Sequence, residues 1–272
     1  MNIRRIGGLA GAAALALSLA ACGGGDDSGS GGDSIKIGIK FDQPGLGLFE
    51  SGKYSGFDVD VANYVAKELG KTKVTFVQAP SKQREDLIAT GQVDLIFATY
   101  SITDARKEKV SFAGPYFIAG QDLLVKADST ITGPKDLDGK KLCSVTGSTS
   151  AENVKKDYPG VQLQNFDTYS KCLDLVANGQ LDALTTDNTI LAGYAAQPAY
   201  KGKLKVVGAP FSTERYGVGL KKGDVDLCKK VNTALEKMVS SGDWQKAVEA
   251  NFGPAGFKVD TAVNPPKPDA CS

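Results

Sequence analysis

Apolar residues along the chain switch between two spacings that predict alternating strands and helices. Residues 35–39 alternate between apolar and other side chains, which is typical of a β-strand. Apolar residues then recur at every fourth position from Phe57 to Leu69, and Gly70 follows as a helix stop. The same reasoning predicts a strand at 73–77, a helix at 84–89 and a strand at 93–98. Strands that alternate with helices indicate an α/β protein whose mostly parallel sheets are flanked by helices.

A nine-residue pattern occurs twice in the chain, at an offset of 88 residues. Residues 87–95 read LIATGQVDL and residues 175–183 read LVANGQLDA. Each copy contains the end of a helix, a glycine suited to a left-handed helix cap, and an aspartate at the start of the next strand. The glycines are Gly91 and Gly179, and the aspartates, for which we expect structural roles, are Asp94 and Asp182. Two copies of one strand–helix unit predict two lobes with a ligand cleft between them, near the carboxyl ends of the strands.

Three later segments indicate how the chain joins the two lobes. Residues 116–126 are expected to run from the first copy into the second, residues 206–220 are strand-like, and residues 227–252 are helical and expected to pack back on the first lobe. Two crossings between the lobes would act as a hinge. The expected boundaries are 34–122 and 212–256 for lobe 1, 123–211 for lobe 2, and 257–272 for a C-terminal tail.

The N-terminus has the pattern of a secretory signal. Two arginines precede the uncharged run 6–21, which at about 16 residues is too short to prefer spanning a bilayer. The run ends Leu-Ala-Ala-Cys and so resembles a bacterial lipoprotein signal, in which the signal peptide 1–21 is removed and Cys22 carries the lipid. A plain secretory signal cut near Ala21 is the alternative. Residues 22–33 are almost only Gly, Ser and Asp, which predicts a flexible tether. We therefore expect a monomer that is lipid-anchored at the extracellular face of the bacterial cell membrane.

The composition excludes several classes of chemistry. Lys and Arg (32) nearly balance Asp and Glu (31), so no overall charge points to nucleic acid. The chain has no histidine, which removes Ser-His-Asp and Cys-His catalysis and imidazole metal sites. It also has no G-x-G-x-x-G or P-loop sequence. We therefore expect a binding protein rather than an enzyme, with no metal, no cofactor and no nucleic-acid partner.

Four cysteines remain after Cys22, and they are expected to form disulfides in an oxidising compartment. Three connectivities are possible among Cys143, Cys172, Cys228 and Cys271. We favour Cys143–Cys172, within one expected lobe, and Cys228–Cys271, which would attach the tail to a helix. Each would stabilise the fold by about 3–4 kcal/mol through loop closure. Four buried free thiols are the alternative.

Polar residues are concentrated in the segments that follow the predicted strands. These segments are 40–47 and 99–106 in the first copy, and 146–150 and 185–188 in the second. Because the carboxyl ends of the strands face the cleft, hydroxyl groups, two cations and one carboxylate are expected to meet there from both lobes. The sequence therefore predicts a site for a small charged solute.

Two short motifs resemble those of a known family. Gly56–Asp60 (GFDVD) and Ser101–Lys107 (SITDARK) are similar to the hallmark stretches of the family-3 extracellular solute-binding proteins, the amino-acid receptors of ABC importers. The resemblance extends over residues 34–255 and implies a two-lobe, type II periplasmic-binding-protein-like fold, with a membrane permease as partner. Resemblance to the glutamate-binding branch is carried by 40–47 (KFDQPGLG), 146–150 (TGSTS) and 211–217 (FSTERYG).

The resemblance also implies which residues bind the carboxylate of an amino acid. Arg106 would form a bidentate pair with it, which suits a planar guanidinium. The hydroxyl of Ser101 and the backbone N–H groups of Ser148 and Thr149 would help. Taken alone, an arginine just after a strand is more often a solvated surface residue.

The ammonium group of an amino acid needs acceptors. Asp187 matches the family's carboxylate, and the carbonyl oxygen of Thr99 is a second acceptor. The alternative for Asp187 is a capping role in a helix that begins near Asn188. Charge-assisted hydrogen bonds contribute about 1.5–3 kcal/mol each, so four or five of them would offset the ordering cost of capture.

Three residues bear on the side chain of the ligand. Lys40 and Arg84 match positions that carry cations in aspartate- and glutamate-binding relatives, and Ser81 stands where several neutral amino-acid receptors carry an aromatic ring. Two cations in a partly desolvated cleft favour an anion, so we expect glutamate, with aspartate as a second ligand. Alternatives are surface positions for both cations, a glutamine or asparagine receptor, a ligand sensor that feeds a membrane receptor, and a dehydratase on the same scaffold.

Overall fold

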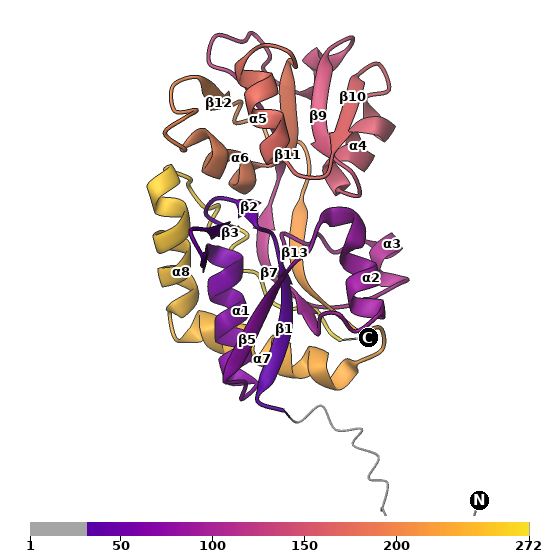
Figure 1. The fold of residues 1–272 in the computed structure, drawn as a ribbon, viewed down its shortest axis with the longest axis vertical. Helices are drawn as coiled ribbons and strands as arrows, with labels where there is room; N and C mark the ends of the chain where they lie inside the picture. Colours follow the sequence, from indigo (N-terminus) through magenta and orange to yellow (C-terminus); the bar gives the residue numbers. More distant parts are fainter. Residues whose placement is uncertain (1–31, 272) are drawn as a thin grey trace, which may run out of the picture. The chain divides into compact units, whose positions relative to one another are not determined.

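Residues 32–271, which the computed structural model describes, contain two five-stranded sheets, one in each half of Figure 1. We call the half around the first sheet lobe 1 and the half around the second sheet lobe 2. The first sheet has, in spatial order, the strands β5 (Lys73–Gln78), β1 (Ser34–Ile39), β6 (Leu95–Ile96), β13 (Glu214–Leu220) and β7 (Ser111–Ala119). The second has β10 (Gln162–Phe166), β9 (Lys141–Val145), β11 (Ala183–Asp187), β8 (Gln121–Lys126) and β12 (Leu204–Val206).

Helices cover both sheets. Lobe 1 has α1 (Phe57–Glu68), α2 (Arg84–Ala89), α3 (Asp104–Lys107), α7 (Val225–Ser240) and α8 (Asp243–Phe252), and the short helices η1 (Ser81–Gln83) and η3 (Gly253–Ala255). Lobe 2 has η2 (Pro134–Leu137), α4 (Thr149–Asp157), α5 (Ser170–Ala177) and α6 (Asn188–Ala195). A small antiparallel sheet packs beside α1 and consists of β2 (Asp42–Gln43), β3 (Gly47–Glu50) and β4 (Lys53–Ser55).

The repeat predicted from the sequence is present in the structure. The units β1-α1-β5-α2-β6 and β9-α4-β10-α5-β11 have the same order of elements, and in both the first strand lies between the other two. The Asp94 carboxylate accepts the backbone N–H of Lys36, and the Asp182 carboxylate accepts that of Lys141, each at 2.8 Å. Each aspartate therefore joins the start of its strand to the neighbouring first strand, and the predicted structural role of both is confirmed.

The chain crosses between the lobes twice, at neighbouring places. Strand β7 leads through Gly120 into β8, and residues 207–213 lead from β12 back to β13. Because β7 and β13 pair antiparallel, the two crossing segments lie side by side in the middle of Figure 1. The three strands of each repeat unit are parallel, and the remaining strands pair antiparallel, so both sheets are mixed.

Some predicted elements differ from the structure. The strand predicted at 93–98 is only the two-residue β6. The region 206–220 contains the end of β12, a connection and β13, and the region 227–252 forms two helices because Gly242 adopts a φ of 79° between them. Residues 185–187, which we expected in a loop, belong to β11 and are buried. Pairing with β8 continues through these polar residues, the Thr185 hydroxyl donates to the Asp122 carbonyl oxygen at 3.1 Å, and Asp187 lines the site described below.

Helices α7 and α8 pack on lobe 1, as expected. Both contact α1, and α7 also contacts β7. The Trp244 ring in α8 lies edge-on to the Phe57 ring at the start of α1, with ring centroids 5.9 Å apart. The indole N–H of Trp244 donates to the carbonyl oxygen of Tyr116 in β7 at 2.9 Å. The two helices therefore support the strand that carries the chain toward lobe 2.

Both favoured disulfides are present, and the free-thiol alternative is wrong. Cys143–Cys172 joins β9 to α5 in lobe 2, and Cys228–Cys271 joins α7 to the C-terminal segment. The paired cysteines are 29 and 43 residues apart in sequence. Loop closure over such separations stabilises a fold by about 4 kcal/mol for each bond.

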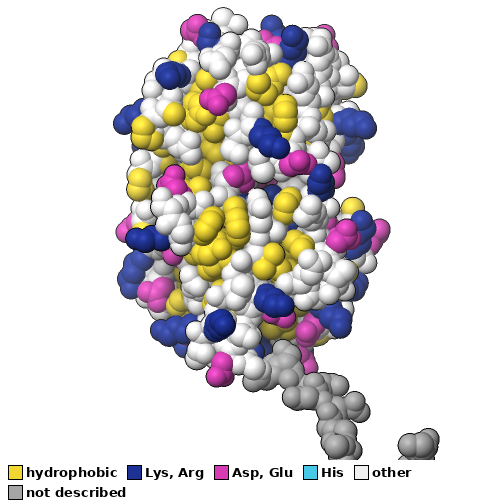
Figure 2. Space-filling model, viewed as in Figure 1, with side chains coloured by type: hydrophobic (Ala, Val, Ile, Leu, Met, Phe, Trp, Pro, Cys, Tyr) yellow, Lys and Arg dark blue, Asp and Glu magenta, His cyan; other side chains and the backbone are white. Residues whose placement is uncertain are grey.

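The predicted signal peptide 1–21, the lipidation site Cys22 and residues 23–31 of the tether lie outside the described residues. Between residues 32 and 271, no helix combines the length and the apolar character that crossing a membrane requires. Figure 2 shows Lys and Arg side chains interspersed with Asp and Glu over one face, in keeping with the balanced composition.

Candidate ligand-binding site

Residues from both lobes line a small cavity of about 10 Å³. The lining residues are Ser81, Arg84, Thr99 and Arg106 from lobe 1, and Ser148, Thr149, Ser150, Tyr169, Asp187 and Ile190 from lobe 2. Two further residues from the sequence prediction lie directly behind this wall. Lys40 Nζ donates to Ser81 Oγ at 2.8 Å, and the Ser101 carbonyl oxygen accepts from the Arg106 guanidinium at 2.8 Å. The structure therefore brings all the predicted contact residues together.

Arg106 is buried, with 7% of its surface exposed, and is not a solvated surface residue. It lies in the short helix α3, where the hydroxyl of the N-cap Thr103 accepts the Arg106 backbone N–H. Its guanidinium donates to the carbonyl oxygen of Ser101 at 2.8 Å and, across the lobe boundary, to that of Gly147 at 3.0 Å. Both terminal nitrogens thus donate to backbone carbonyl oxygens, one in each lobe, and a planar guanidinium is also suited to a carboxylate.

The first turn of α4 faces the same cavity. Ser148 is the N-cap, and its hydroxyl accepts the backbone N–H of Ala151 at 3.1 Å. The backbone N–H groups of Thr149 and Ser150 have no acceptor within the helix, as in the first turn of any helix, and the helix dipole there favours an anion. The Thr149 hydroxyl is already engaged, because it donates to Glu214 Oε2 at 3.0 Å. The backbone donors of this turn are therefore the groups that suit a ligand carboxylate.

Asp187 ends β11 and lies at the N-cap position of α6, but its side chain accepts no capping hydrogen bond. The structure therefore does not support the capping alternative. Its Oδ2 accepts the Tyr216 hydroxyl at 2.7 Å, and its Oδ1 is buried with no hydrogen-bond partner among residues 32–271. Burial, and secondly the Glu214 carboxylate, raise the pKa of Asp187 from 3.8 to about 8. A buried, unpaired carboxylate oxygen is costly, so this position favours a cation that donates hydrogen bonds.

Lys40 and Arg84 are buried cations, with 5% and 2% of their surfaces exposed, so neither is a surface charge. Burial, and secondly Arg84, lower the pKa of Lys40 from 10.5 to about 7. Burial, and secondly Arg106, lower the pKa of Arg84 from 12.5 to about 10. Cations that are desolvated and lie near one another favour an anionic partner, because an anion restores the charged forms.

Tyr100, which the sequence analysis missed, contacts both arginines. The guanidinium carbons of Arg84 and Arg106 lie 4.1 and 5.0 Å from the centre of its ring. Its hydroxyl donates to Glu85 Oε1 at 2.6 Å, and the same carboxylate lies 3.7 Å from Arg106 Nε. An aromatic ring with its negative face toward cations stabilises them and limits their motion. Tyr100 and Glu85 thus hold the two guanidinium groups in place.

Thr99 has an unusual backbone conformation that depends on the GFDVD motif. Its φ is 46°, in the left-handed region that few residues other than glycine adopt. The buried carboxylate of Asp58, within that motif, accepts the Thr99 backbone N–H at 2.9 Å and the Tyr116 hydroxyl at 2.7 Å. Asp58 therefore fixes the peptide that leads into Thr99, which lines the cavity. This role was not predicted from the sequence, where the motif served only as a resemblance.

Three residues that line the cavity were also missed, namely Ser150, Tyr169 and Ile190. Ser150 follows two predicted contacts directly, so its position on the first turn of α4 could have been inferred. Tyr169 is the N-cap of α5 and Ile190 lies in the first turn of α6, and their access to the cavity depends on how those helices pack. No local sequence signal distinguishes such residues from ordinary core residues.

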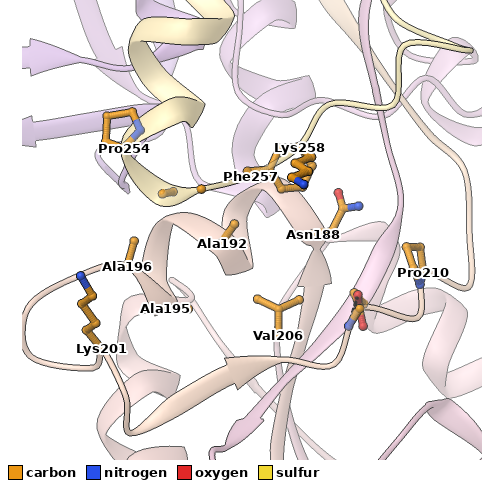
Figure 3. A pocket seen from close by; sticks show the side chains of 14 residues that line it. Asn188, Ala192, Ala195, Ala196, Lys201, Val206, Pro210, Pro254, Phe257 and Lys258 are labelled. Atoms are coloured by element: carbon orange, nitrogen blue, oxygen red, sulfur yellow. Dashed lines mark hydrogen bonds between the residues drawn. The ribbon is translucent and has the colours of Figure 1, made fainter.

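A larger cavity, of about 700 Å³, lies elsewhere in the described region (Figure 3). It is formed by α6, the end of β12 and the segment after α8, and it includes Asn188, Lys201, Phe257 and Lys258. Size alone would favour this cavity as the ligand site. It shares no lining residue with the small cavity, however, and the buried cations and the unpaired Asp187 oxygen belong to the small one. We therefore assign the candidate site to the small cavity.

Comparisons with known proteins place this geometry in context. Residues 35–254 match the family described as bacterial extracellular solute-binding proteins, family 3. The glutamate-binding protein GluB of Corynebacterium glutamicum is 47% identical, covering 94% of this chain and 93% of its own. The ABC transporter glutamine-binding protein GlnH of Bacillus subtilis is 39% identical, covering 79% of each chain. An ancestral arginine-binding protein bound to arginine has a TM-score of 0.76 at 36% identity, covering 81% of this chain and 99% of that one. The predicted two-lobe α/β fold is confirmed.

Proposed function

The chain belongs to the bacterial extracellular solute-binding proteins of family 3, and we propose that it captures a free amino acid, with glutamate preferred, for an ABC importer. One observation carries this proposal. Arg106 and Asp187, from opposite lobes, line one cavity, the first with a fork of donors and the second with an unpaired carboxylate oxygen. The carboxylate and ammonium groups of an amino acid complement both.

The preference for an acidic ligand is proposed to come from Lys40 and Arg84. GluB and GlnH are named for glutamate and glutamine, which differ only at the end of the side chain. A distal carboxylate near Lys40 would raise the lowered pKa of that amine, because a nearby anion stabilises the charged form. A neutral amide gives much less of this stabilisation. The buried amine of Lys40 therefore favours glutamate over glutamine.

Capture requires the two lobes to part. The cavity of about 10 Å³ is far smaller than an amino acid, so a ligand enters only when its walls separate. On closure, the ligand ammonium group would bond to the unpaired Oδ1 of Asp187 and lower the pKa of that carboxyl. A ligand that contacts both lobes stabilises the closed form by its difference in affinity for the two forms. No covalent change in the ligand is needed, and mass spectrometry of recovered glutamate would test this.

We further propose that the protein acts at the outer face of the membrane, held by a lipid on Cys22, where the closed form delivers its ligand to a permease. The Leu-Ala-Ala-Cys sequence supports this proposal. A Cys22→Ser variant is expected to appear in the medium instead of the membrane fraction. Retention of that variant in the membrane fraction would contradict the lipid anchor.

The function is tested by calorimetric titration of the lipid-free protein with glutamate, aspartate, glutamine and asparagine. Arg106→Ala should abolish binding of all four, because it removes the partner of the carboxylate that they share. Arg84→Ala should weaken the binding of glutamate and aspartate more than the binding of glutamine and asparagine. Arg215→Ala is the matched control, because Arg215 lies at the surface and pairs with Asp269.

The outcomes separate the parts of the proposal. If no amino acid binds the wild-type protein, the proposed function is wrong. If an amide binds more tightly than both acids, the assignment of Lys40 and Arg84 is wrong. Equal losses for all four ligands in Arg106→Ala and Arg84→Ala would contradict the division of roles between these arginines.

A further inference from the structure

The lobes also touch at a place outside the ligand cavity. There the β2 segment of lobe 1, residues 42–44, lies against α5 and α6 of lobe 2. The Tyr194 hydroxyl of α6 donates to the Asp42 carbonyl oxygen at 2.8 Å and lies 3.2 Å from Asp42 Oδ2. The same Oδ2 accepts the backbone N–H of Ser170, the first residue of α5, at 3.3 Å. Lobe 1 thus supplies hydrogen-bond acceptors for two helices of lobe 2.

Gly193 makes the closest approach in this contact. A Cβ built on Gly193 would overlap the Pro44 carbonyl oxygen and lie 3.1 Å from the Pro44 carbonyl carbon. Both are backbone atoms, which cannot rotate away as the end of a side chain could. Any larger residue at position 193 would therefore push the β2 segment away from α6.

No other feature explains a glycine at this position. Gly193 lies within helix α6 and is not among the glycines with a positive φ, so its backbone conformation suits any residue. Inside a helix, glycine is less favourable than alanine. Gly193 also does not line the ligand cavity. What remains is the contact with Pro44.

We propose that Gly193, Tyr194 and residues 42–44 form a closure contact that sets ligand affinity without touching the ligand. The proposal rests on the proposed function, in which the lobes part to admit an amino acid and close around it. Such a contact exists only in the closed form, so it adds to the stability of that form alone. Weakening it lowers the fraction of protein able to close and lowers the apparent affinity by the same factor.

Two variants test the closure contact. Gly193→Ala introduces the overlap with Pro44 and should weaken glutamate binding by about 10- to 100-fold, as expected of an overpacked contact. Tyr194→Phe removes one hydroxyl and should weaken binding by about two- to tenfold. Variants of Asp42 are less suitable, because its charge also acts on Lys40 near the ligand.

The matched control is Gly133→Ala, also in lobe 2. A Cβ on Gly133 meets no atom within 4 Å, and its φ of 176° suits alanine. Calorimetry should give the wild-type affinity for this variant. The melting temperature of ligand-free Gly193→Ala should equal or exceed that of the wild type, because the open form loses no contact and alanine favours the helix.

The results decide between closure and ordinary packing. Wild-type affinity in both Gly193→Ala and Tyr194→Phe would overturn the proposal. The proposal would also be overturned if both ligand-free variants lost as much free energy of unfolding, seen as a lower melting temperature, as they lost in binding free energy. The residues would then serve folding. If the wild-type protein binds no amino acid, the proposed function fails. If the wild-type protein binds glutamate and both variants bind it with the same affinity, the closure contact alone is overturned.

Discussion

Replacing Asp187 by Asn should make the ligand-free protein more stable and should weaken its binding of glutamate. One substitution would thus have two opposite effects. Asp187 is buried, and the pKa of its carboxyl is raised from 3.8 to about 8, first by burial and then by Glu214. The folded state therefore binds the proton more tightly than the unfolded state does. Stability from this group is greatest at low pH and is lost as the pH rises from about 3.8 to about 8.

The size of the effect follows from the two pKa values of Asp187. The raised pKa of Asp187 lowers the free energy of unfolding by at most about 4 kcal/mol at pH 7 and by about 2 kcal/mol at pH 5. Asparagine has no charge to bury and can still accept from Tyr216, but its amide N–H groups lack acceptors, which costs about 1–3 kcal/mol. Asp187→Asn should thus raise the free energy of unfolding by about 1–3 kcal/mol at pH 7 and change it little at pH 5.

Thermal melts of the ligand-free protein at the two pH values measure this gain. A gain of 1 kcal/mol raises the melting temperature of a protein of this size by about 2–4 °C. Calorimetry at pH 7 should show that Asp187→Asn weakens glutamate binding by about 10- to 100-fold, because the ammonium group loses a charged acceptor.

Asp122→Asn is the matched control. Asp122 lies in β8, opposite Thr186, and is buried with a raised pKa caused by burial, but it lines the larger cavity. This variant should retain glutamate binding. Loss of binding in Asp122→Asn and wild-type binding in Asp187→Asn would move the site to the larger cavity. An Asp187→Asn variant that is less stable than the wild type at pH 7 would refute the reasoning on burial.

Three further predictions concern stability and its link to the ligand. Replacing Cys143 and Cys172 together by Ala should lower the free energy of unfolding in urea by about 3–4 kcal/mol, and a change below about 1 kcal/mol would contradict the loop-closure account. Asp94→Ala and Asp182→Ala should each lower it by about 1–2 kcal/mol and leave glutamate affinity unchanged, because both carboxylates bond to strand backbone and neither lines the small cavity. Unequal effects would argue against the equivalence of the two repeat units. Glutamate at 100 times its dissociation constant should stabilise the wild type by about 2.7 kcal/mol, and Arg106→Ala should show no such shift.

The sequence predicted those parts of the fold that have local signals. The repeat was visible because each copy ends its helix with a glycine in the left-handed conformation, Gly91 at a φ of 68° and Gly179 at 72°, and opens a strand with an aspartate. Residues 185–187 were misplaced in a loop because a run of polar residues does not look like a buried strand. In the packed structure, the Thr185 hydroxyl bonds to the neighbouring strand, and Asp187 lines the site and bonds to Tyr216 of lobe 1.

Only part of the candidate site was predicted, because here too only residues with a local sequence signal could be found. Arg106 and Asp187 were found because they stand in or near motifs with a recognisable order along the chain. Contacts between distant segments had no such signal, for example the hydrogen bond from Thr149 to Glu214 and the approach of Gly193 to Pro44. These contacts depend on how the lobes meet, which no spacing along the sequence encodes.

A crystal structure of the lipid-free protein with bound glutamate tests the central claim most directly. We predict that the ligand carboxylate lies within hydrogen-bond distance of both terminal nitrogens of Arg106, and that its ammonium group lies within hydrogen-bond distance of Asp187 Oδ1. Glutamate bound in the larger cavity beside Phe257 and Lys258, with Arg106 and Asp187 making no contact to it, would contradict the account.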